Sequence, residues 1–316
     1  MAYTNFIGSG VSVNGAPLLP GGGSVPLGNT YFFVNSVTGS DGNEGTADAP
    51  FGTLAWAITK CTANTGCVIV LQQGHAETIT SNTALPFNVA GVTIVGLGTG
   101  ADRPTFTLST ANTNRIPVSA ANIKIQNCIF IGNFLSIATC FLLTTAPNFT
   151  VDSCAFRDTS AILGFLSIIT TTVTVNADGL TFTNNTRQSG ATTTPGPDIV
   201  IAGTIDRVTV VGNTSWHSTI SNNVAALINH GALVVTNLDC GYNKIYSVNT
   251  SQTNGALLIT SATTGSGVIY NNYVRTLTVT AFILITAAAV QYGLFNNYVQ
   301  TDPNTSGELE PGAGTN

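Results

Sequence analysis

The sequence predicts an all-β solenoid in which short strands and tight corners repeat in stacked coils of about 25 residues. Three observations predict it: a recurring eight-residue segment, a Gly or Asn at a fixed place in that segment, and a second apolar run between successive segments. One such unit cannot bury its own apolar face, whereas stacked units bury it continuously. We therefore expect one rod over residues 30–301 and not two domains.

The recurring segment alternates apolar and polar residues, as a strand with one buried face does. Its fifth residue is mostly Gly or Asn, which tolerate the left-handed backbone of a tight corner. The differences between the first residue numbers of successive copies range from 25 to 34. The copies are Val92–Thr99, Ile123–Phe130, Phe149–Phe156, Val175–Phe182, Val208–Ser215, Leu233–Cys240, Gly267–Val274 and Tyr292–Val299. The second apolar run, such as Cys140–Leu143, gives each coil two or three strands.

The two ends of the chain differ from the coils. Residues 51–62 place Phe51, Leu54 and Ile58 on one face at helical spacing, which predicts an amphipathic helix. Such a helix would cover the open edge of the first coil. Residues 1–29 are dense in Gly and Pro without a period and predict an extended N-terminal arm. Residues 302–316 predict a flexible C-terminal tail.

Composition excludes several classes of protein. Only 7% of residues are charged, 43% are apolar and the mean hydropathy is +0.31, which excludes disorder. The longest near-continuous apolar run, Ala281–Val290, is shorter than the roughly 18 residues of a membrane-spanning helix. Nine basic residues against fourteen acidic ones argue against nucleic-acid binding. The first residues lack the pattern of a secretory signal, so we expect no export by that route.

The six cysteines are scattered and show neither CxxC spacing nor clustered histidines. We therefore expect no metal site and no cofactor. Cys61 and Cys67 are close enough to form the one plausible disulfide, but synthesis inside a cell favours free thiols. We expect the cysteines to be mostly reduced and buried.

The segment Tyr31–Ile58 has a strand, a Gly/Asp/Asn-rich turn and Pro-Phe before the expected cap helix. With this segment and the coil period, residues 31–301 resemble the single-stranded, right-handed parallel β-helix proteins of the pectate-lyase-like superfamily. Through Gly74–Ile79 and Asn122–Phe130 the sequence is most similar to structural proteins of tailed-phage virions. That resemblance implies a capsid decoration or a tail spike, and a homotrimer.

The superfamily contains polysaccharide lyases and hydrolases, but their catalytic motifs are missing here, so we predict no catalytic residue. The candidates weighed against this prediction are Asp152 and Asp178, the fourth residues of consecutive segments, with Lys124 and Arg157 near them. Their backbones should lie roughly 5 Å apart on one outward face. Two carboxylates at such a distance can hydrolyse a glycoside, but we favour an exposed pair without catalytic function.

The three histidines carry little functional signal. His75 and Glu77 share one face of an expected strand, either as an acid/base pair or, as we favour, as a structural hydrogen-bonded pair. His217 and His230 are isolated and are interpreted as surface residues or as hydrogen-bonded structural residues.

The expected function is that of a non-enzymatic bacteriophage virion structural protein. It would be a capsid decoration (cement) protein or a tail-associated β-helix spike, anchored by residues 1–29 and located on the virion after synthesis in the host cytoplasm. Its partners would be copies of itself and the major capsid or tail proteins, with host polysaccharide as a further candidate and with no nucleic acid and no membrane. The alternative is a polysaccharide-binding or depolymerising tail spike that uses Asp152, Asp178 or a groove between subunits. A bacterial surface adhesin is a third reading, which the missing export signal disfavours.

Overall fold

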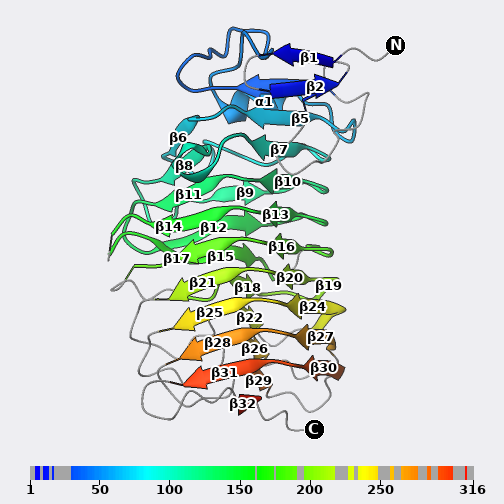
Figure 1. The fold of residues 1–316 in the computed structure, drawn as a ribbon. Coiled ribbons are helices and arrows are strands. Elements are labelled where there is room, and N and C mark those ends of the chain that lie inside the picture. The colour runs from blue at the N-terminus through cyan, green and yellow to red at the C-terminus, as the bar shows by residue number, and fades with distance from the viewer. Residues whose placement is uncertain are drawn as a thin grey trace.

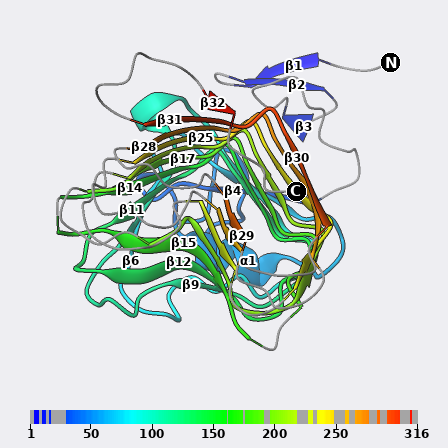
Figure 2. The ribbon, with the colours of Figure 1, turned by 90° about the horizontal axis from the view of Figure 1, so that it is seen from below.

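The molecule is a rod of stacked coils, with β5 near one end and β31 near the other (Figure 1). The computed structural model describes residues 30–160, 162–173, 176–190, 196–217, 227–230, 234–247, 257–259, 265–276, 283–285 and 291–301, and strands at 4–7, 10–13, 16–17 and 310–311. Three parallel sheets run along the rod and form its walls, and successive coils superpose in the end-on view (Figure 2). The predicted all-β solenoid, a parallel β-helix, is confirmed.

Each sheet takes a strand from each of several successive coils. Sheet 1 contains β4 (Tyr31–Val34), β5 (Val68–Leu71), β7 (Thr93–Gly96), β10 (Lys124–Gln126), β13 (Thr150–Asp152), β16 (Thr181–Thr183), β20 (Thr209–Val211), β24 (Leu238–Gly241), β27 (Ser266–Tyr270) and β30 (Gln291–Phe295). Sheet 2 contains β6 (Ala76–Ile79), β8 (Thr105–Leu108), β11 (Ile129–Gly132), β14 (Ala155–Asp158), β17 (Thr186–Gln188), β21 (Thr214–His217), β25 (Lys244–Ser247), β28 (Tyr273–Thr276) and β31 (Tyr298–Thr301). Sheet 3 contains β9 (Ile116–Val118), β12 (Ile137–Leu143), β15 (Phe165–Thr171), β18 (Ile199–Ile201), β22 (Ile228–His230), β26 (Leu257–Ile259) and β29 (Ile283–Ile285). A short pair, β19 (Ile205–Asp206) and β23 (Val235–Thr236), lies outside these sheets.

Each of five successive coils has two left-handed corners, five residues apart, on either side of its sheet 1 strand. Asn122 and Asn127 flank β10 with φ values of 58° and 56°. Asn tolerates this backbone, and Gly adopts it without strain, which confirms the expected role of these residues at corners. The equivalent pairs are Asn148 and Ser153, Gly179 and Asn184, Arg207 and Gly212, and Asn237 and Tyr242.

Two of the eight segments that the sequence predicted begin five residues before the position that strand pairing gives them. Thr181 pairs with Thr209, so Leu180 and not Val175 aligns with Val208. Thr209 pairs with Asp239, so Leu238 and not Leu233 aligns with Val208. The physical reason is the pair of corners in each coil. Both corners favour the same residue types, so at these two places the sequence pattern matched the first corner in place of the second.

Phenylalanine rings fill the core behind sheet 2 in the first coils. Phe106, Phe130 and Phe156 are register partners and are almost completely buried. Their rings stack with centroid distances of 5.5 Å and 5.3 Å. The next residue in this column is Arg187, followed by Ser215, so the aromatic stack ends at β17.

Buried asparagines take over at the second corner of the later coils. The side-chain oxygen of Asn213 accepts a hydrogen bond from the backbone N–H of Asn185 at 2.9 Å, and Asn243 does the same for Asn213 at 3.0 Å. Each amide nitrogen in turn donates to a backbone carbonyl, as Asn213 does to Phe182. The ladder consists of Asn185, Asn213, Asn243, Asn272 and Asn297. It satisfies backbone groups that the tight corner would otherwise leave unpaired.

The predicted cap helix is α1 (Leu54–Lys60), shorter than the expected 51–62. Thr53 caps it by accepting a hydrogen bond from the N–H of Trp56, and Leu54, Ala57 and Ile58 are buried. Its contacts with β4 and β5 place it over the first coil, as expected. One turn of 3₁₀ helix, η1 (Gly100–Asp102), lies between β7 and β8.

The cysteine prediction is partly wrong. Cys61 and Cys67 form a disulfide that ties the end of α1 to the residue before β5. Their Cα atoms are 5.7 Å apart, within reach of a bridge, because the turn between them brings them together. Cys128, Cys140, Cys154 and Cys240 are free and buried, as predicted.

The expected arm contains some regular structure. Within residues 1–29, β1 (Thr4–Ile7), β2 (Gly10–Val13) and β3 (Ala16–Pro17) form a small antiparallel sheet. In the expected tail, β32 (Glu310–Pro311) pairs antiparallel with β31. The other residues of both segments lie outside the described part of the chain. No helix among the described residues is long and apolar enough to cross a membrane.

Candidate functional site

Asp152 lies at the end of β13 and is held by hydrogen bonds. Gln126 donates to its Oδ2 at 2.7 Å, and Thr183 and Asn184 donate to its Oδ1 at 3.0 Å and 3.1 Å. Partial burial acts to raise the pKa of Asp152, but these hydrogen bonds and Lys124 lower it below its usual value. A carboxylate held in its ionised form by neighbouring coils is suited to a structural role and is a poor proton donor.

Asp178 does not occupy the position that the sequence predicted. The register partner of Asp152 in the next coil is Thr183, whereas Asp178 lies at the other corner, before β16. The side chain of Asp178 accepts a hydrogen bond from the backbone N–H of Asp206 at 2.8 Å. The expected pair on one outward face is therefore wrong, because the five-residue displacement placed the two residues in false alignment.

His75 and Glu77 form a structural pair at the first coil. His75 is fully buried, and its Nδ1 accepts a hydrogen bond from the backbone N–H of Ser36 at 3.0 Å. Its Nε2 must then carry the proton that it shares with Glu77 Oε1 at 2.9 Å. The same Glu77 oxygen accepts from the N–H of Leu54 at the start of α1. The hydrogen-bonded pair agrees with the favoured structural interpretation, and it also fixes the cap helix to β6.

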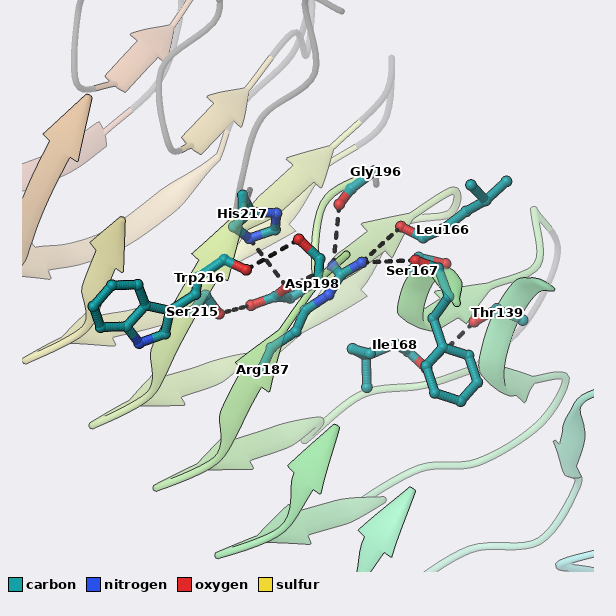
Figure 3. Close-up of polar contacts among 12 residues, drawn as sticks. Thr139, Leu166, Ser167, Ile168, Arg187, Gly196, Asp198, Ser215, Trp216 and His217 are labelled. Atoms are coloured by element: carbon teal, nitrogen blue, oxygen red, sulfur yellow. Dashed lines mark hydrogen bonds and ion pairs between the residues drawn. The ribbon is translucent and has the colours of Figure 1, made fainter. Parts of the chain in front are cut away.

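A buried ion pair replaces the phenylalanine stack at β17. Arg187 and Asp198 are 2% and 0% exposed, and Arg187 donates to Asp198 Oδ1 at 2.7 Å (Figure 3). Arg187 also donates to the carbonyl oxygens of Gly196, Phe165 and Leu166. These bonds join sheet 2 to sheet 3 across the core. Burial acts to raise the pKa of Asp198, but Arg187 and then His217 outweigh it and lower the pKa.

Two residues of β21 complete the cluster. Ser215 donates to Asp198 Oδ2, and His217 Nε2 lies 3.5 Å from Asp198 Oδ1. His217 is buried, so its interpretation as an isolated surface residue is wrong, and it is a structural residue whose Nε2 faces Asp198 without a hydrogen bond. Because side chains alternate along a strand, Trp216 between them points outward, away from the cluster (Figure 3). The cluster therefore fixes the strand that carries Trp216.

Asp158 closes the same region at the end of β14. Its carboxylate accepts hydrogen bonds from the backbone N–H groups of Phe165 at 3.0 Å and Gly190 at 2.7 Å. Burial raises the pKa of Asp158, although Arg187 and both donors act to lower it. A Cβ atom on Gly164 would lie 2.0 Å from this carboxyl group, so only glycine fits there.

The outer side of the same strands carries an exposed aromatic pair. Trp216 is 53% exposed, and its ring stacks on Tyr246 of the next coil with centroids 4.2 Å apart and planes at 16°. The ring centroid of Tyr246 in turn lies 6.0 Å from that of Tyr273. Tyr273 donates a hydrogen bond to Gln300, and Tyr298 beside it is 39% exposed. Sheet 2 thus presents four aromatic residues outward over its last four coils.

Basic residues flank these rings. Arg157, Lys244 and Arg275 are exposed on the outward side of β14, β25 and β28. Gln188 is the register partner of Trp216, and Arg157 is the partner of Gln188. Arg157 therefore lies on sheet 2, not beside Asp152 on sheet 1 as the sequence suggested. No group of three His, Cys, Asp or Glu residues able to hold a metal occurs within the described ranges.

The sequence contains a signal for the aromatic pair. Thr214–His217 and Lys244–Ser247 both place an aromatic residue third in a strand, between inward positions. Once the coils are aligned, these places coincide. The repeat did not align Trp216 with Tyr246, because the segment at Leu233 begins five residues before the position that strand pairing gives it.

The comparisons with known proteins support the fold alone. No family model matches the sequence, and the curated proteins contain no significant match. Among solved structures, a rhamnogalacturonan lyase is similar at 14% identity and a TM-score of 0.43, covering 85% of this chain and 87% of that one. An alginate lyase from Paenibacillus sp. str. FPU-7 has 14% identity, a TM-score of 0.29, and coverage of 78% and 96%. A GH136 lacto-N-biosidase from Eubacterium ramulus has 10% identity, a TM-score of 0.27, and coverage of 86% and 68%.

These structures are all named as enzymes, which contradicts the expectation of a non-enzymatic protein, and we withdraw that expectation. None of them provides a link to a virion structural protein. The chain is a β-solenoid whose structural neighbours are polysaccharide-lyase-like β-helix proteins and a glycoside hydrolase.

Proposed function

We propose that the protein binds a polysaccharide on the outer face of sheet 2, at the stacked rings of Trp216 and Tyr246. The observation that supports this most strongly is the exposure of Trp216, which remains 53% although one face of its ring is covered by Tyr246. Leaving so large an apolar surface in water is costly, and such surfaces commonly mark binding sites. The flat face of an aromatic ring suits the apolar C–H face of a sugar ring.

The supporting strands hold the rings in place. Ser215 and His217 anchor β21 to the buried Asp198, and Ile245 of β25 is buried in the core. A preorganised aromatic residue loses little side-chain entropy on binding, so it contributes more affinity than a mobile one. The face of the indole opposite Tyr246 is directed toward the preceding coil, where its register partner Gln188 is exposed and can hydrogen-bond sugar hydroxyls.

The test is to measure binding of a panel of neutral and acidic polysaccharides by affinity electrophoresis and calorimetry. Trp216→Ala should weaken binding of the preferred polysaccharide at least tenfold, and Tyr246→Ala should weaken it less, because Tyr246 is more covered. The matched control is Phe295→Ala, an aromatic residue 57% exposed on sheet 1, which should bind as the wild type does.

Unchanged binding by Trp216→Ala, or equal loss in Phe295→Ala, would overturn the proposal. Release of sugar fragments from the same polysaccharides should also be measured. A depolymerising protein cleaves the chain that it binds, whereas a purely binding protein leaves it intact. Residence on a virion and trimerisation stay predictions from the resemblance, and anchoring by residues 1–29 stays a prediction from their Gly- and Pro-rich sequence.

A further inference from the structure

We infer that the polysaccharide is anionic and lies along the rod axis, with its anionic groups near Arg157 and Arg275 on either side of the aromatic pair. This inference rests on the proposed function and names the class of ligand for that same face. Three independent features carry it: the distribution of charge over the chain, the order of side chains along one column, and the open face of the indole.

The charge of this face is opposite to that of the whole protein. The chain has fourteen acidic and nine basic residues, for a net charge of −5. Among the described strands β8 to β31 of sheet 2, the outward positions hold no acidic residue, but they hold three of the nine basic ones: Arg157, Lys244 and Arg275. In a protein with so few charges, this separation produces a local positive field that favours an anionic ligand.

The order of residues along the outermost column gives the direction. Register pairs connect Arg157 to Gln188, Gln188 to Trp216, Trp216 to Tyr246, and Tyr246 to Arg275. Neighbouring strands are about 4.8 Å apart, so Arg157 and Arg275 stand roughly 19 Å apart at their backbones, with the rings between them. A polymer that lies across successive coils meets both arginines and the rings, whereas one that follows a single coil meets only one of them.

The open face of the Trp216 indole explains how ring stacking and ionic contacts combine in one binding site. Tyr246 covers the side of Trp216 toward the later coils, so a sugar ring stacks on the other side, above Gln188. A carboxylate or sulfate on the next sugar would then be within reach of the flexible Arg157 side chain. The guanidinium group binds such oxyanions through paired hydrogen bonds. Lys244 and Arg275 supply the same interaction beyond Tyr246.

Single-stranded nucleic acid also combines stacking with negative charge. The negative net charge of the protein and the small number of basic residues on this face favour the polysaccharide. We therefore treat nucleic acid as an outcome of the test.

The experiment uses polysaccharides in pairs that differ only in charge: polygalacturonate and its methyl ester, alginate and its propylene glycol ester, and dextran sulfate and dextran. The wild type should bind the anionic member of at least one pair tenfold or more tightly than its neutral partner, and added salt should weaken that binding. The carboxylated and sulfated pairs show which anionic group is preferred. Equal affinity for both members of every pair, or no binding to any anionic member, would overturn the inference.

Variants separate this inference from the proposed function. Arg157→Gln and Arg275→Gln should each weaken binding of the anionic polymer about threefold to tenfold and leave binding of its neutral partner unchanged. Arg207→Gln, at a side chain 61% exposed outside sheet 2, is the control and should change neither. If Trp216→Ala abolishes binding while both arginine variants bind normally, only the anionic class is wrong. If Trp216→Ala has no effect, the proposed function fails. Tighter binding of oligo-dT than of any polysaccharide would overturn the inference in favour of nucleic acid.

Discussion

The coils before β17 and the coils after it differ in where sheet 2 places its aromatic residues. Before β17 the aromatic residues lie in the core, and after β17 they lie on the outer face. From β8 to β14, phenylalanine rings stack in the core, and the outward positions of β8 are Thr105 and Thr107. From β17 to β25, the core column holds Arg187, Ser215 and then Ile245, and the rings of Trp216 and Tyr246 face outward. The backbone pairing of sheet 2 continues through this change.

The difference shows how a solenoid separates stability from recognition. Each coil interacts mainly with its two neighbours, so the chemistry of the core can change along the rod without changing the fold. The first coils are stabilised by buried apolar surface. The later coils depend on hydrogen bonds of the asparagine ladder and on the Arg187–Asp198 pair. Because alternate residues of a strand face opposite sides, the outward aromatic residues of these coils are independent of the residues that fill the core.

The largest effect on stability is expected from Asp198→Asn. Removing one partner of a buried ion pair leaves Arg187 charged and uncompensated, which costs about 3–5 kcal/mol. Urea unfolding followed by tryptophan fluorescence should show this loss, and hydrogen exchange should place it in β17, β18 and β21. The first coils should keep their protection, because they lack direct contact with the pair.

Asp206→Asn is the matched control for that variant. Asp206 also accepts side-chain hydrogen bonds, from Thr236 and Asn237, but it lies at the surface. Its replacement should change stability far less than Asp198→Asn does. Similar losses in both variants would mean that burial of the ion pair does not distinguish the later coils.

A smaller effect, confined to the first coils, is expected from Cys61→Ser. A disulfide that closes so short a loop contributes about 2 kcal/mol by restricting the unfolded chain. Hydrogen exchange should become faster in α1 and β5 and stay unchanged in β25. Reducing agent should reproduce this result in the wild type and have no further effect on the variant. Faster exchange along the whole rod would show that the two regions unfold together.

The sequence predicted the architecture well, because apolar alternation and corner residues are local signals. The register was harder, since Gly179 and Asn184 mark two similar corners within one coil and either can align with the next coil. Trp216 and Asp198 escaped prediction for a related reason. Each acquires its role from residues in neighbouring coils, and a five-residue displacement removes those neighbours from the alignment. The aromatic pair becomes predictable only after every coil is in register.

The smallest expected effect concerns pH, and it contrasts Asp158 of the buried cluster with Asp206 at the surface. The pKa of Asp158 is raised above the usual 3.8, so its contribution to stability is fully present below pH 3.8 and is lost as the pH rises through the raised pKa. The pKa of Asp206 is lowered, chiefly by its hydrogen bonds from Thr236 and Asn237. Its contribution is present above pH 3.8 and is lost as the pH falls through the lowered pKa.

The two residues therefore predict opposite slopes. Between about pH 3 and pH 7, the wild type should lose stability relative to Asp158→Asn as the pH rises, because the carboxylate of Asp158 must ionise in a buried site. Over the same range the wild type should gain stability relative to Asp206→Asn. Urea midpoints at several pH values measure both differences, and any constant loss from an altered hydrogen bond cancels in the slopes. Slopes of the same sign would show that Asp158 is ionised as easily as a surface carboxylate, and that the core of the later coils is open to water.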